Sequence, residues 1–391
     1  MKSVSEIKDC YGCGVCAASC GRNAISMKLN SVGFYGPNVN KQLCVDCGLC
    51  VDVCSFLKDD VEKEGILVPK FFASWSNDEN IRNICSSGGV GYEIEKFLLE
   101  KKYTAIVCRY NSETGRAEHF IAQTKDELKE SIGSKYIQSD AYVGFSKIER
   151  GKKYLIVGTP CQIDSARRWM KKMKMNDKVV LMDFFCHGVP SMVMWDKYLK
   201  EVEKKIGFVD NIVWRDKGNG WHDSWVMKVD NRYVSKFSQG DMFYRMFLKN
   251  RCLAKSCYEK CKFKEISSAA DIRVGDLWGS KYSKNEKGVS GVVALTKIGS
   301  DLYDSMCDIL CSEQTTKDVV CESQMKKSAH RPISYGYVMK NLSTRKSLED
   351  IDRVARLLEM VEEIPNTIRY YVSRLPVKLG NVFRVVESKK R

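Results

Sequence analysis

Cysteines carry the clearest chemistry in this chain, and eight of them form two copies of one pattern. The spacing C-x2-C-x2-C-x3-C occurs at Cys10, Cys13, Cys16 and Cys20, and again at Cys44, Cys47, Cys50 and Cys54. Two intervening residues let a tight turn direct three thiolates at one cubane, and the longer step directs the fourth thiolate away. The spacing predicts two 4Fe-4S clusters and an entry point for electrons.

Each run is similar to those of bacterial two-cluster ferredoxins, in which the fourth cysteine ligates the other cluster. That similarity implies one cluster on Cys10, Cys13, Cys16 and Cys54, and a second on Cys44, Cys47, Cys50 and Cys20. Ferredoxin runs normally continue with proline, whereas Gly21 and Ser55 stand at those two positions. We expect the missing prolines to loosen the turns without removing a ligand.

Two other interpretations of the cysteines fit less well. Structural zinc sites also use paired C-x2-C motifs, but they usually stop at four cysteines per ion and leave a longer gap between the pairs. A disulfide framework requires a secreted chain, and residues 1–30 lack the apolar core and cleavage site of a signal peptide. Iron–sulfur binding explains the pattern better than either.

Length and composition indicate a folded protein of two or three domains. The chain has 391 residues, of which 44% are hydrophobic and 29% charged. Eighteen cysteines indicate metal binding in a reducing compartment. No run reaches the roughly 18 apolar residues that a membrane helix requires. We therefore expect a cytoplasmic protein, with peripheral membrane contact as a variant of that expectation.

The formal net charge of +15 has an explanation other than nucleic-acid binding. An oxidised cubane with four thiolates carries about −2, so the two predicted clusters and a third one on other cysteines of the chain would subtract about 6 charges. If a flavin dinucleotide is bound as well, its pyrophosphate would subtract about 2 more. The remaining charge, about +7 by the same count, suits an acidic electron carrier, a phosphorylated substrate or an anionic membrane surface.

The elements that position these residues can be predicted from hydrophobic patterns. Residues 57–65 form a charged linker, and Gly88-Gly89 opens a helix with Val90, Ile94, Phe97 and Leu98 on one face. Strands are predicted over 105–108, 154–157 and 179–185, and a helix with a basic outer face over 164–173. Cys161 and Cys186 follow two of these strands. The carboxyl ends of strands are where open α/β sheets place their chemistry.

The second half of the chain gives weaker signals. Residues 212–234 are predicted to form a strand pair whose tryptophans belong to the core or cover a cofactor. Cys307 and Cys311, four residues apart, are predicted as buried thiols on one helical face. Residues 347–360 form a helix, followed by a basic tail. That tail is predicted either to lie on anionic lipid or to pack as a helix on the body.

Beyond the cysteine runs, the chain resembles the family of coenzyme F-420 hydrogenase/dehydrogenase beta subunits, in the branch with an N-terminal ferredoxin. Seven segments carry the resemblance, in family order: Ser86-Ser87-Gly88-Gly89, Gly133-Ser134-Lys135-Tyr136, Gly158-Thr159-Pro160-Cys161-Gln162, Cys186-His187-Gly188-Val189-Pro190, Trp214-Arg215-Asp216-Lys217, Ser256-Cys257 to Cys261-Lys262-Phe263, and Asp271-Ile272 to Gly275-Asp276-Leu277-Trp278-Gly279. They span residues 82 to about 292, and the final sixty residues match nothing in the family.

The resemblance implies an FAD-containing iron–sulfur oxidoreductase, because a flavin converts single electrons from clusters into two-electron chemistry. The residues that it implies in cofactor binding are Ser87, Gly88, Gly89, Gly133, Ser134, Lys135, Thr159 and Gln162. Glycines before a helix suit a phosphate, whereas the alternative for each segment is a plain glycine turn. No G-x-G-x-x-G follows a strand, so a Rossmann dinucleotide site is unsupported.

A third cubane is implied at Cys161, Cys186, Cys257 and Cys261. The family usually spaces the last pair as C-x2-C, whereas this chain has C-x3-C, and Cys252 stands near enough in sequence to replace one member. The alternative is that these cysteines are simply buried, as we expect for Cys85 and Cys108. His187 follows Cys186 directly, and it could donate a proton to a substrate or hydrogen-bond a cluster sulfur.

We therefore predict a mixed α+β or α/β protein with four regions: a two-cluster ferredoxin domain (1–64), a flavin-contacting region (65–150), a catalytic and cluster domain (151–330) and a helical basic tail (331–391). Its predicted activity passes electrons from a low-potential donor such as a ferredoxin, through three clusters and FAD, to a small organic acceptor such as a sugar intermediate. The alternatives are a non-catalytic electron-transfer subunit of a larger complex and, less favoured, a nucleic-acid-binding iron–sulfur protein.

Overall fold

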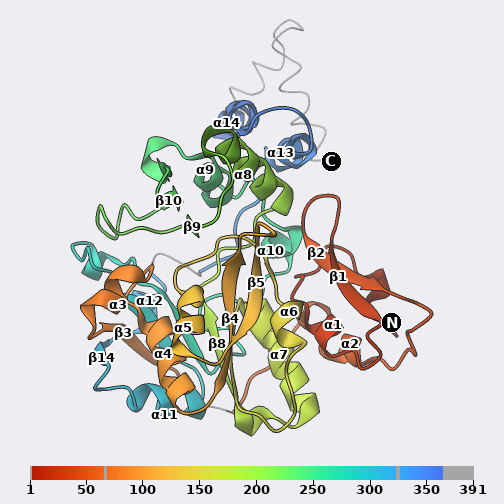
Figure 1. The fold of residues 1–391 in the computed structure, drawn as a ribbon, viewed down its shortest axis with the longest axis vertical. Coiled ribbons are helices and arrows are strands. Elements are labelled where there is room, and N and C mark those ends of the chain that lie inside the picture. Colours follow the sequence, from red (N-terminus) through yellow and green to blue (C-terminus); the bar gives the residue numbers. More distant parts are fainter. Residues whose placement is uncertain (1, 66–67, 323–325, 364–391) are drawn as a thin grey trace, which may run out of the picture.

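Three packed regions make up the computed structural model, which describes residues 2–65, 68–322 and 326–363 (Figure 1). The N-terminal region is small and built around its cysteine turns. Its elements are the 3₁₀ turns η1 (Val4–Glu6) and η2 (Ser55–Leu57), the short helices α1 (Val15–Ala18) and α2 (Leu49–Asp52), and an antiparallel hairpin of β1 (Ile25–Leu29) and β2 (Tyr35–Val39). Gly14 and Gly48 precede the two helices with φ of 77° and 79°, a conformation that favours glycine.

A nine-stranded sheet forms the body, in the order β14-β3-β13-β12-β8-β7-β4-β5-β6. Its centre, β12, β8, β7 and β4, is parallel, and antiparallel strands extend both sides. The bounds are β3 (Lys70–Ser76), β4 (Thr104–Asn111), β5 (Arg116–Ala122), β6 (Ser139–Asp140), β7 (Tyr154–Gly158), β8 (Val179–Phe184), β12 (Ile272–Asp276), β13 (Ser290–Ala294) and β14 (Leu310–Gln314). The apolar runs in β7 and β8 are buried, as expected for central parallel strands.

Helices flank this sheet. They are α3 (Glu79–Ile84), α4 (Val90–Glu100), α5 (Lys125–Leu128), α6 (Tyr142–Phe145), α7 (Pro160–Met173), α10 (Lys255–Glu259), α11 (Lys297–Asp304) and α12 (Lys317–Val320), with the 3₁₀ turns η3 (Lys129–Ser131), η4 (Asn176–Lys178) and η6 (Ser280–Tyr282). The predicted apolar face of α4 is confirmed, because Val90, Ile94 and Leu98 on this face are buried in the core.

A third region lies at one end of the sheet (Figure 1). It combines α8 (Met192–Ile206), α9 (Met242–Leu248), α13 (Tyr335–Leu342), α14 (Leu348–Glu363), η5 (Phe237–Gln239) and a small sheet of β9 (Ile212–Val213), β10 (Val226–Val229) and β11 (Tyr233–Lys236). Its core holds Trp195, Trp214 and Phe247. The prediction of a helix at 347–360 is confirmed, and the basic tail beyond residue 363 lies outside the described residues.

One sequence prediction was wrong, and a second was only partly right. Cys307 follows the end of α11, and Cys311 lies on β14; both are exposed rather than buried on a helix. The helix predicted over 164–173 is present but begins at Pro160, and its basic outer face is confirmed only in part: Lys171 and Lys172 are exposed, whereas the two arginines are buried. Arg167 and Arg168 are 1% and 8% exposed, because the linker covers them.

That linker is fixed by ion pairs and hydrogen bonds. Glu62 pairs with Arg168 and Lys171, at 3.1 and 2.6 Å, and Glu64 pairs with Arg167 at 2.8 Å. The ammonium of Lys262 donates to backbone carbonyls of the linker, including Lys58 O at 2.8 Å. We call residues 58–64 the strap, because they hold the N-terminal region against α7. No helix in the described ranges is both long and apolar enough to span a bilayer.

Candidate iron–sulfur and cofactor site

The first cysteine run meets the last cysteine of the second run in one place. Cys10, Cys13, Cys16 and Cys54 all line a small cavity of about 20 Å³. Burial, and after it the neighbouring thiols Cys13, Cys10 and Cys54, raise the pKa of Cys16 well above its usual value. Four thiols converging on one enclosed space fit a cubane, whose iron would hold them as thiolates.

The second run gathers with Cys20. Burial, followed by the neighbouring Cys47, Cys20 and Cys44, raises the pKa of Cys50. The fourth cysteine of each run therefore lies with the other run, which is the crossed arrangement that the ferredoxin similarity implies. This second group is nearer the surface: Cys47 is exposed, and Val45 beside it is 61% exposed.

Four further thiols gather in the body. Burial, and then Cys186 and Cys261, raise the pKa of the Cys257 thiol to about 12. Cys161, in the first turn of α7, has Cys186 and Cys257 among the neighbours that raise its pKa. All four implied ligands of a third cubane, Cys161, Cys186, Cys257 and Cys261, line one large cavity.

The C-x3-C spacing is accommodated by the local backbone. Cys257 lies on α10, and Cys261 follows that helix at the cavity wall. Gly188 has a φ of +148°, and a Cβ there would stand 3.0 Å from Leu253 Cδ1, so glycine lets the Cys186 loop lie close to the segment before α10. Cys252, the other candidate, is not among the residues that line this cavity and is fully buried in the core of the third region.

The first and third groups of thiols adjoin each other. Cys13 donates to the Ser165 hydroxyl on α7 at 3.4 Å, one turn after Cys161, and Cys13 is among the neighbours that raise the pKa of Cys161. Tyr11 lines both cavities, with ring contacts of 5.2 Å to Phe56 and 5.9 Å to Phe263. The two groups of thiols are therefore neighbours, and Tyr11 contributes to the wall of both cavities.

The thiol groups differ from a site for one metal ion. All eighteen cysteines are free thiols. Across the described residues, no three His, Cys, Asp or Glu side chains stand close enough together to hold a single ion. In a cubane each thiolate binds a different iron, so its four ligands stand farther apart than those of tetrahedral zinc.

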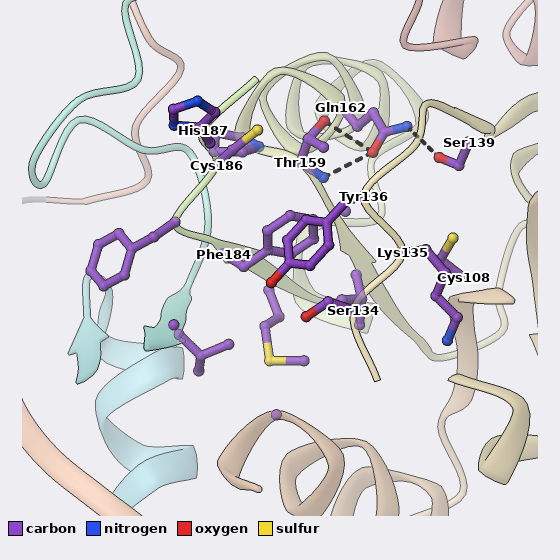
Figure 2. Close-up of a pocket in the computed structure, with 18 of the residues that line it drawn as sticks. Cys108, Ser134, Lys135, Tyr136, Ser139, Thr159, Gln162, Phe184, Cys186 and His187 are labelled. Carbon is purple, nitrogen blue, oxygen red and sulfur yellow. Dashed lines mark hydrogen bonds between the residues drawn. The ribbon is translucent and has the colours of Figure 1, made fainter. Parts of the chain in front are cut away.

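The large cavity has a volume of about 340 Å³, within the range of roughly 300–1,000 Å³ for ligand sites. It lies at the carboxyl ends of β7, β8 and β12, as the sequence predicts for an open sheet. Figure 2 shows Cys186 and His187 on one side of it and Lys135 and Cys108 on the other, with Tyr136 and Phe184 toward the centre.

Cys85 and Cys108, expected in the core, also line this cavity. Of the residues that the resemblance implies in cofactor binding, all except Gly88 do so. Gly88 instead packs between strands: a Cβ there would stand 2.6 Å from Ser74 O and 2.8 Å from Ser290 N. Its lack of a side chain serves the packing of the fold.

Several of the implied contacts are engaged within the protein. Ser134 bonds Ser86 through both its N–H and its hydroxyl, at 2.9 and 3.1 Å. The Lys135 ammonium donates to three carbonyls, Glu130 O, Ser131 O and Ile132 O, at 2.8–3.0 Å. Its three N–H groups are thereby used, so Lys135 shapes the cavity wall instead of offering a donor to a phosphate.

Thr159 and Gln162 cap helix α7. The Gln162 carbonyl oxygen accepts from the N–H and the hydroxyl of Thr159 at 2.8 and 3.0 Å, and its amide donates to Ser139 at 3.2 Å (Figure 2). The Gln162 side chain thus satisfies the N–H of Thr159 at the start of the helix, as in a capping box. It fixes the turn that carries Cys161, which is a positioning role.

The N-terminus of α4 is the part of the cavity that fits a phosphate. Gly89, Val90 and Gly91 line the cavity, and no side chain caps this helix. The first N–H groups of a helix have no partner within it and attract an anion. Gly133, with a φ of +83°, leaves open space where a Cβ would stand. These features fit a flavin phosphate and ring, although the described contacts identify no further phosphate donor.

Two buried cations hold the loop before α4. Lys217 donates to Ser87 O at 2.8 Å, and burial lowers its pKa to about 8. Arg215 donates to Ser86 O at 3.4 Å and to Asp276 at 3.0 Å, and it lies 4.6 Å from the Trp225 ring. The family segment around Trp214 therefore fixes the loop that forms this part of the cavity wall.

His187 stands at the cavity edge, with its ring 5.1 Å from Phe247. Desolvation lowers its pKa from the usual value. The geometry brings His187 beside Cys186 and the cavity, and its predicted part in proton donation stays a prediction. Sequence reasoning missed Tyr11 and Glu95, which line the cavity without any spacing signal.

Comparison with known proteins gives a consistent result along the chain. The model of the 4Fe-4S dicluster domain matches residues 9–57. The models described as coenzyme F420 hydrogenase/dehydrogenase, beta subunit, match at residues 71–142 for the N-terminal part and 151–318 for the C-terminal part. The chain belongs to this family of beta subunits. The predicted membership is confirmed, as is a 4Fe-4S domain at the N-terminus, so the chain is an iron–sulfur protein of an oxidoreductase family.

The relatives of this beta subunit include a subunit of the F(420)H(2) dehydrogenase of Methanosarcina mazei, 27% identical over 305 residues, which are 71% of this chain and 80% of the relative. An uncharacterised protein of Methanocaldococcus jannaschii is 25% identical over 42% of this chain and 56% of its own length. A chain of the F420-reducing [NiFe] hydrogenase complex from Methanosarcina barkeri aligns over 78% of this chain and 97% of its own, with 15% identity and a TM-score of 0.45.

Proposed function

We propose that this chain is the iron–sulfur electron-transfer subunit of a complex of the F420 hydrogenase/dehydrogenase type. Electrons pass between the exposed second cluster and the large cavity by way of the first and third clusters. In the cavity they are exchanged with a flavin, which pairs single electrons for two-electron chemistry. This extends the predicted relay and favours the alternative of a subunit over a free-standing reductase.

The observation that carries the proposal is the position of Cys161. The Cys161 thiol lies near Cys13 of the N-terminal region, and also near Cys186 and Cys257 of the cavity wall. A third cubane there would close the gap between the ferredoxin domain and the cavity. The relative in Methanosarcina mazei is named as a subunit of a dehydrogenase of reduced coenzyme F420, which makes that compound the first two-electron donor to test.

A second candidate function is the predicted reductase of a small organic acceptor. It is favoured by the cavity itself, which has the volume of a ligand site and a wall surface that is mostly apolar, with polar side chains placed in it. The two candidates share the clusters and the flavin, and they differ in the compound that exchanges electrons in the cavity: reduced coenzyme F420 for the subunit, and an organic acceptor for the reductase.

The first experiment measures iron, acid-labile sulfide and acid-released flavin on anaerobically purified protein. We expect about twelve iron atoms, four per cubane, and one flavin per chain. About eight iron atoms and no flavin would leave a two-cluster domain fused to a body of another function and would overturn the proposal.

The second experiment distinguishes the two candidates. The isolated chain is mixed anaerobically with reduced coenzyme F420 and a viologen dye. Dye reduction by the isolated chain, with no dependence on an added sugar acceptor, supports the role of an electron-transfer subunit. Oxidation of reduced viologen only in the presence of an added organic acceptor would instead favour the reductase.

A further inference from the structure

One carboxyl group in the cavity has no part in the electron path. Glu95 lies on α4, lines the cavity and is only 7% exposed. Its Oε2 atom is 2.7 Å from the Ser131 hydroxyl. Within the described ranges, no hydrogen bond reaches its Oε1 atom, and no cation forms an ion pair with it. Glu95 is thus a buried carboxyl in the cavity wall, and one of its two oxygens accepts no hydrogen bond from the described residues.

The nearest cation does not pair with this carboxyl. Lys135 faces Glu95 from the loop after η3, but its three N–H groups are taken by backbone carbonyls. A buried carboxylate without a hydrogen-bonded cation is costly, and such a group usually keeps its proton. Glu95 therefore differs from Glu93 on the same helix, which pairs with Lys96 at 2.7 Å and does not line the cavity.

The surroundings of Ser131 favour the protonated form. The Ser131 oxygen lies 2.7 Å from Leu128 O and 2.7 Å from Glu95 Oε2. A serine has one O–H group to donate, and a backbone carbonyl can only accept. When Ser131 donates to Leu128 O, a protonated Glu95 can complete the chain by donating to the Ser131 oxygen. An ionised Glu95 would leave one of the two acceptors without a hydrogen.

We propose that Glu95 is the proton donor and acceptor of the cavity for the two-electron group that is reduced or oxidised there. This rests on the proposed function, because it supplies protons to the same site to which the clusters supply electrons. The electron path carries no protons, and an organic group that gains two electrons without a proton gains two negative charges in an apolar cavity.

The step balances as follows. Two electrons arrive singly from reduced iron–sulfur clusters. The Glu95 carboxyl turns its O–H group from Ser131 toward the acceptor, and this O–H bond breaks as a bond from the hydrogen to a nitrogen or carbon of the conjugated organic acceptor forms. The acceptor therefore gains one negative charge instead of two, and the Glu95 carboxylate regains a proton from water. Oxidation of a reduced donor runs the same step in reverse.

The groups that face Glu95 are consistent with titration near neutral pH. They are Lys135 and Ser131 after α5, Cys85 before α4, Cys108 on β4, and Tyr92 on its own helix. Desolvation raises the pKa of Glu95 to about 7, against the lowering effects of the Ser131 hydrogen bond and the Lys135 charge. A general acid works best with a pKa near the working pH.

Infrared difference spectroscopy of the cluster-loaded full chain tests the proton directly, whether or not flavin is bound. Spectra are recorded between about pH 5 and pH 9, which brackets the usual and the shifted values for a glutamate. The wild type should lose a protonated-carboxyl band with a midpoint near 7, Glu95→Gln should lack it, and Glu93→Gln should keep it. A wild type with no such band in this range would overturn the proposal, even if the variants fail to fold.

The rate at which the bound flavin is reduced by dithionite tests proton delivery. We expect Glu95→Gln to keep its iron and flavin but to slow this reduction by about 10²-fold, the lower end for loss of a general acid. Glu93→Gln should match the wild type. Flavin reduction in Glu95→Gln at the wild-type rate would overturn the role of Glu95. Absence of flavin from the wild type would count against the proposed function, and the infrared titration would still decide whether Glu95 holds a proton.

Discussion

At the residue scale, the chemistry of this chain lies in its cysteine thiols and in Glu95. Thiols in a ferredoxin spacing could be assigned to clusters from their type alone, and the structure gathers Cys54 with the first run and Cys20 with the second. Single residues without a spacing pattern could not be found this way. Glu95 is one of many glutamates in the sequence, and only the fold shows that it lines a cavity and that no described residue forms an ion pair with it.

The third cluster makes a prediction with a matched control. Cys161→Ala should lower iron from about twelve to about eight atoms per chain, because a cubane that loses one of its ligands is lost as a unit. Cys252→Ala should keep about twelve, since this thiol is buried in another core. Iron analysis on anaerobically purified variants checks both. Iron level with the wild type in Cys161→Ala would contradict the third cluster.

Glu95 also makes a prediction about stability. Its pKa rises from 4.5 in an unfolded chain to about 7, so the folded state binds the proton more tightly. The free energy of unfolding should therefore fall as pH rises through that window, by about 3 kcal/mol at about 1.4 kcal/mol per pKa unit.

Glu95→Gln removes this dependence, because an amide does not titrate. The variant should gain stability relative to the wild type as pH rises from about 5 to about 8. Anaerobic thermal unfolding of both proteins at the two pH values measures the difference. A difference in midpoint temperature that stays constant with pH would show that Glu95 has an ordinary pKa.

At the scale of elements, apolar runs predicted the central strands well because strands buried on both faces need continuous hydrophobic sequence. The start of α7 was missed for a local reason. Thr159, Pro160 and Gln162 form a helix N-terminus with a capping box, whereas the glycine and proline content suggested a loop. Cys307 and Cys311 were misplaced because a spacing of four residues also occurs across a helix end and an edge strand.

The N-terminus of α4 offers a sharper test of flavin binding than the loop before it. Gly91 lines the cavity, and a Cβ there would meet only Val274, at an ordinary 3.7 Å. Gly91→Ala should therefore fold and keep its flavin, whereas Gly91→Leu should fill the cavity and lose flavin with its iron unchanged. Acid-released flavin and iron analysis measure this. Equal flavin content in both variants would show that the flavin does not bind at the N-terminus of α4.

At the scale of the whole molecule, the sequence located the regions but not their docking. The strap was predicted as a linker from its charges, and its partners lie about a hundred residues away in sequence. Ser55 adds two bonds at the same interface: its N–H donates to Ser165 at 3.1 Å, and its hydroxyl donates to Asp164. Proline at this position has no N–H and no hydroxyl, so the departure from the ferredoxin pattern serves docking.

The strap predicts how firmly the N-terminal region is held. Glu62→Gln removes one of the carboxylates that pair with Arg168 and the one that pairs with Lys171. It should speed protease cleavage within residues 58–64 by about tenfold, equivalent to about 1.4 kcal/mol of docking free energy. Asp59→Asn is the control, because this exposed residue has no ion pair within the described ranges. Gel analysis of a time course measures the rates, and equal rates would show that the strap's charges do not hold the docked state.

Docking of the N-terminal region has a kinetic consequence. With its first cysteine group enclosed against α7 and Cys47 of the second group exposed, the relay that we propose would meet an external redox protein at the second group. On that proposal, the transfers between clusters take place within one molecule and are first order, so dilution slows the encounter with the redox protein but not the transfers between clusters. The turnover rate should then rise with partner concentration and level off at a maximum set by electron transfer within the chain.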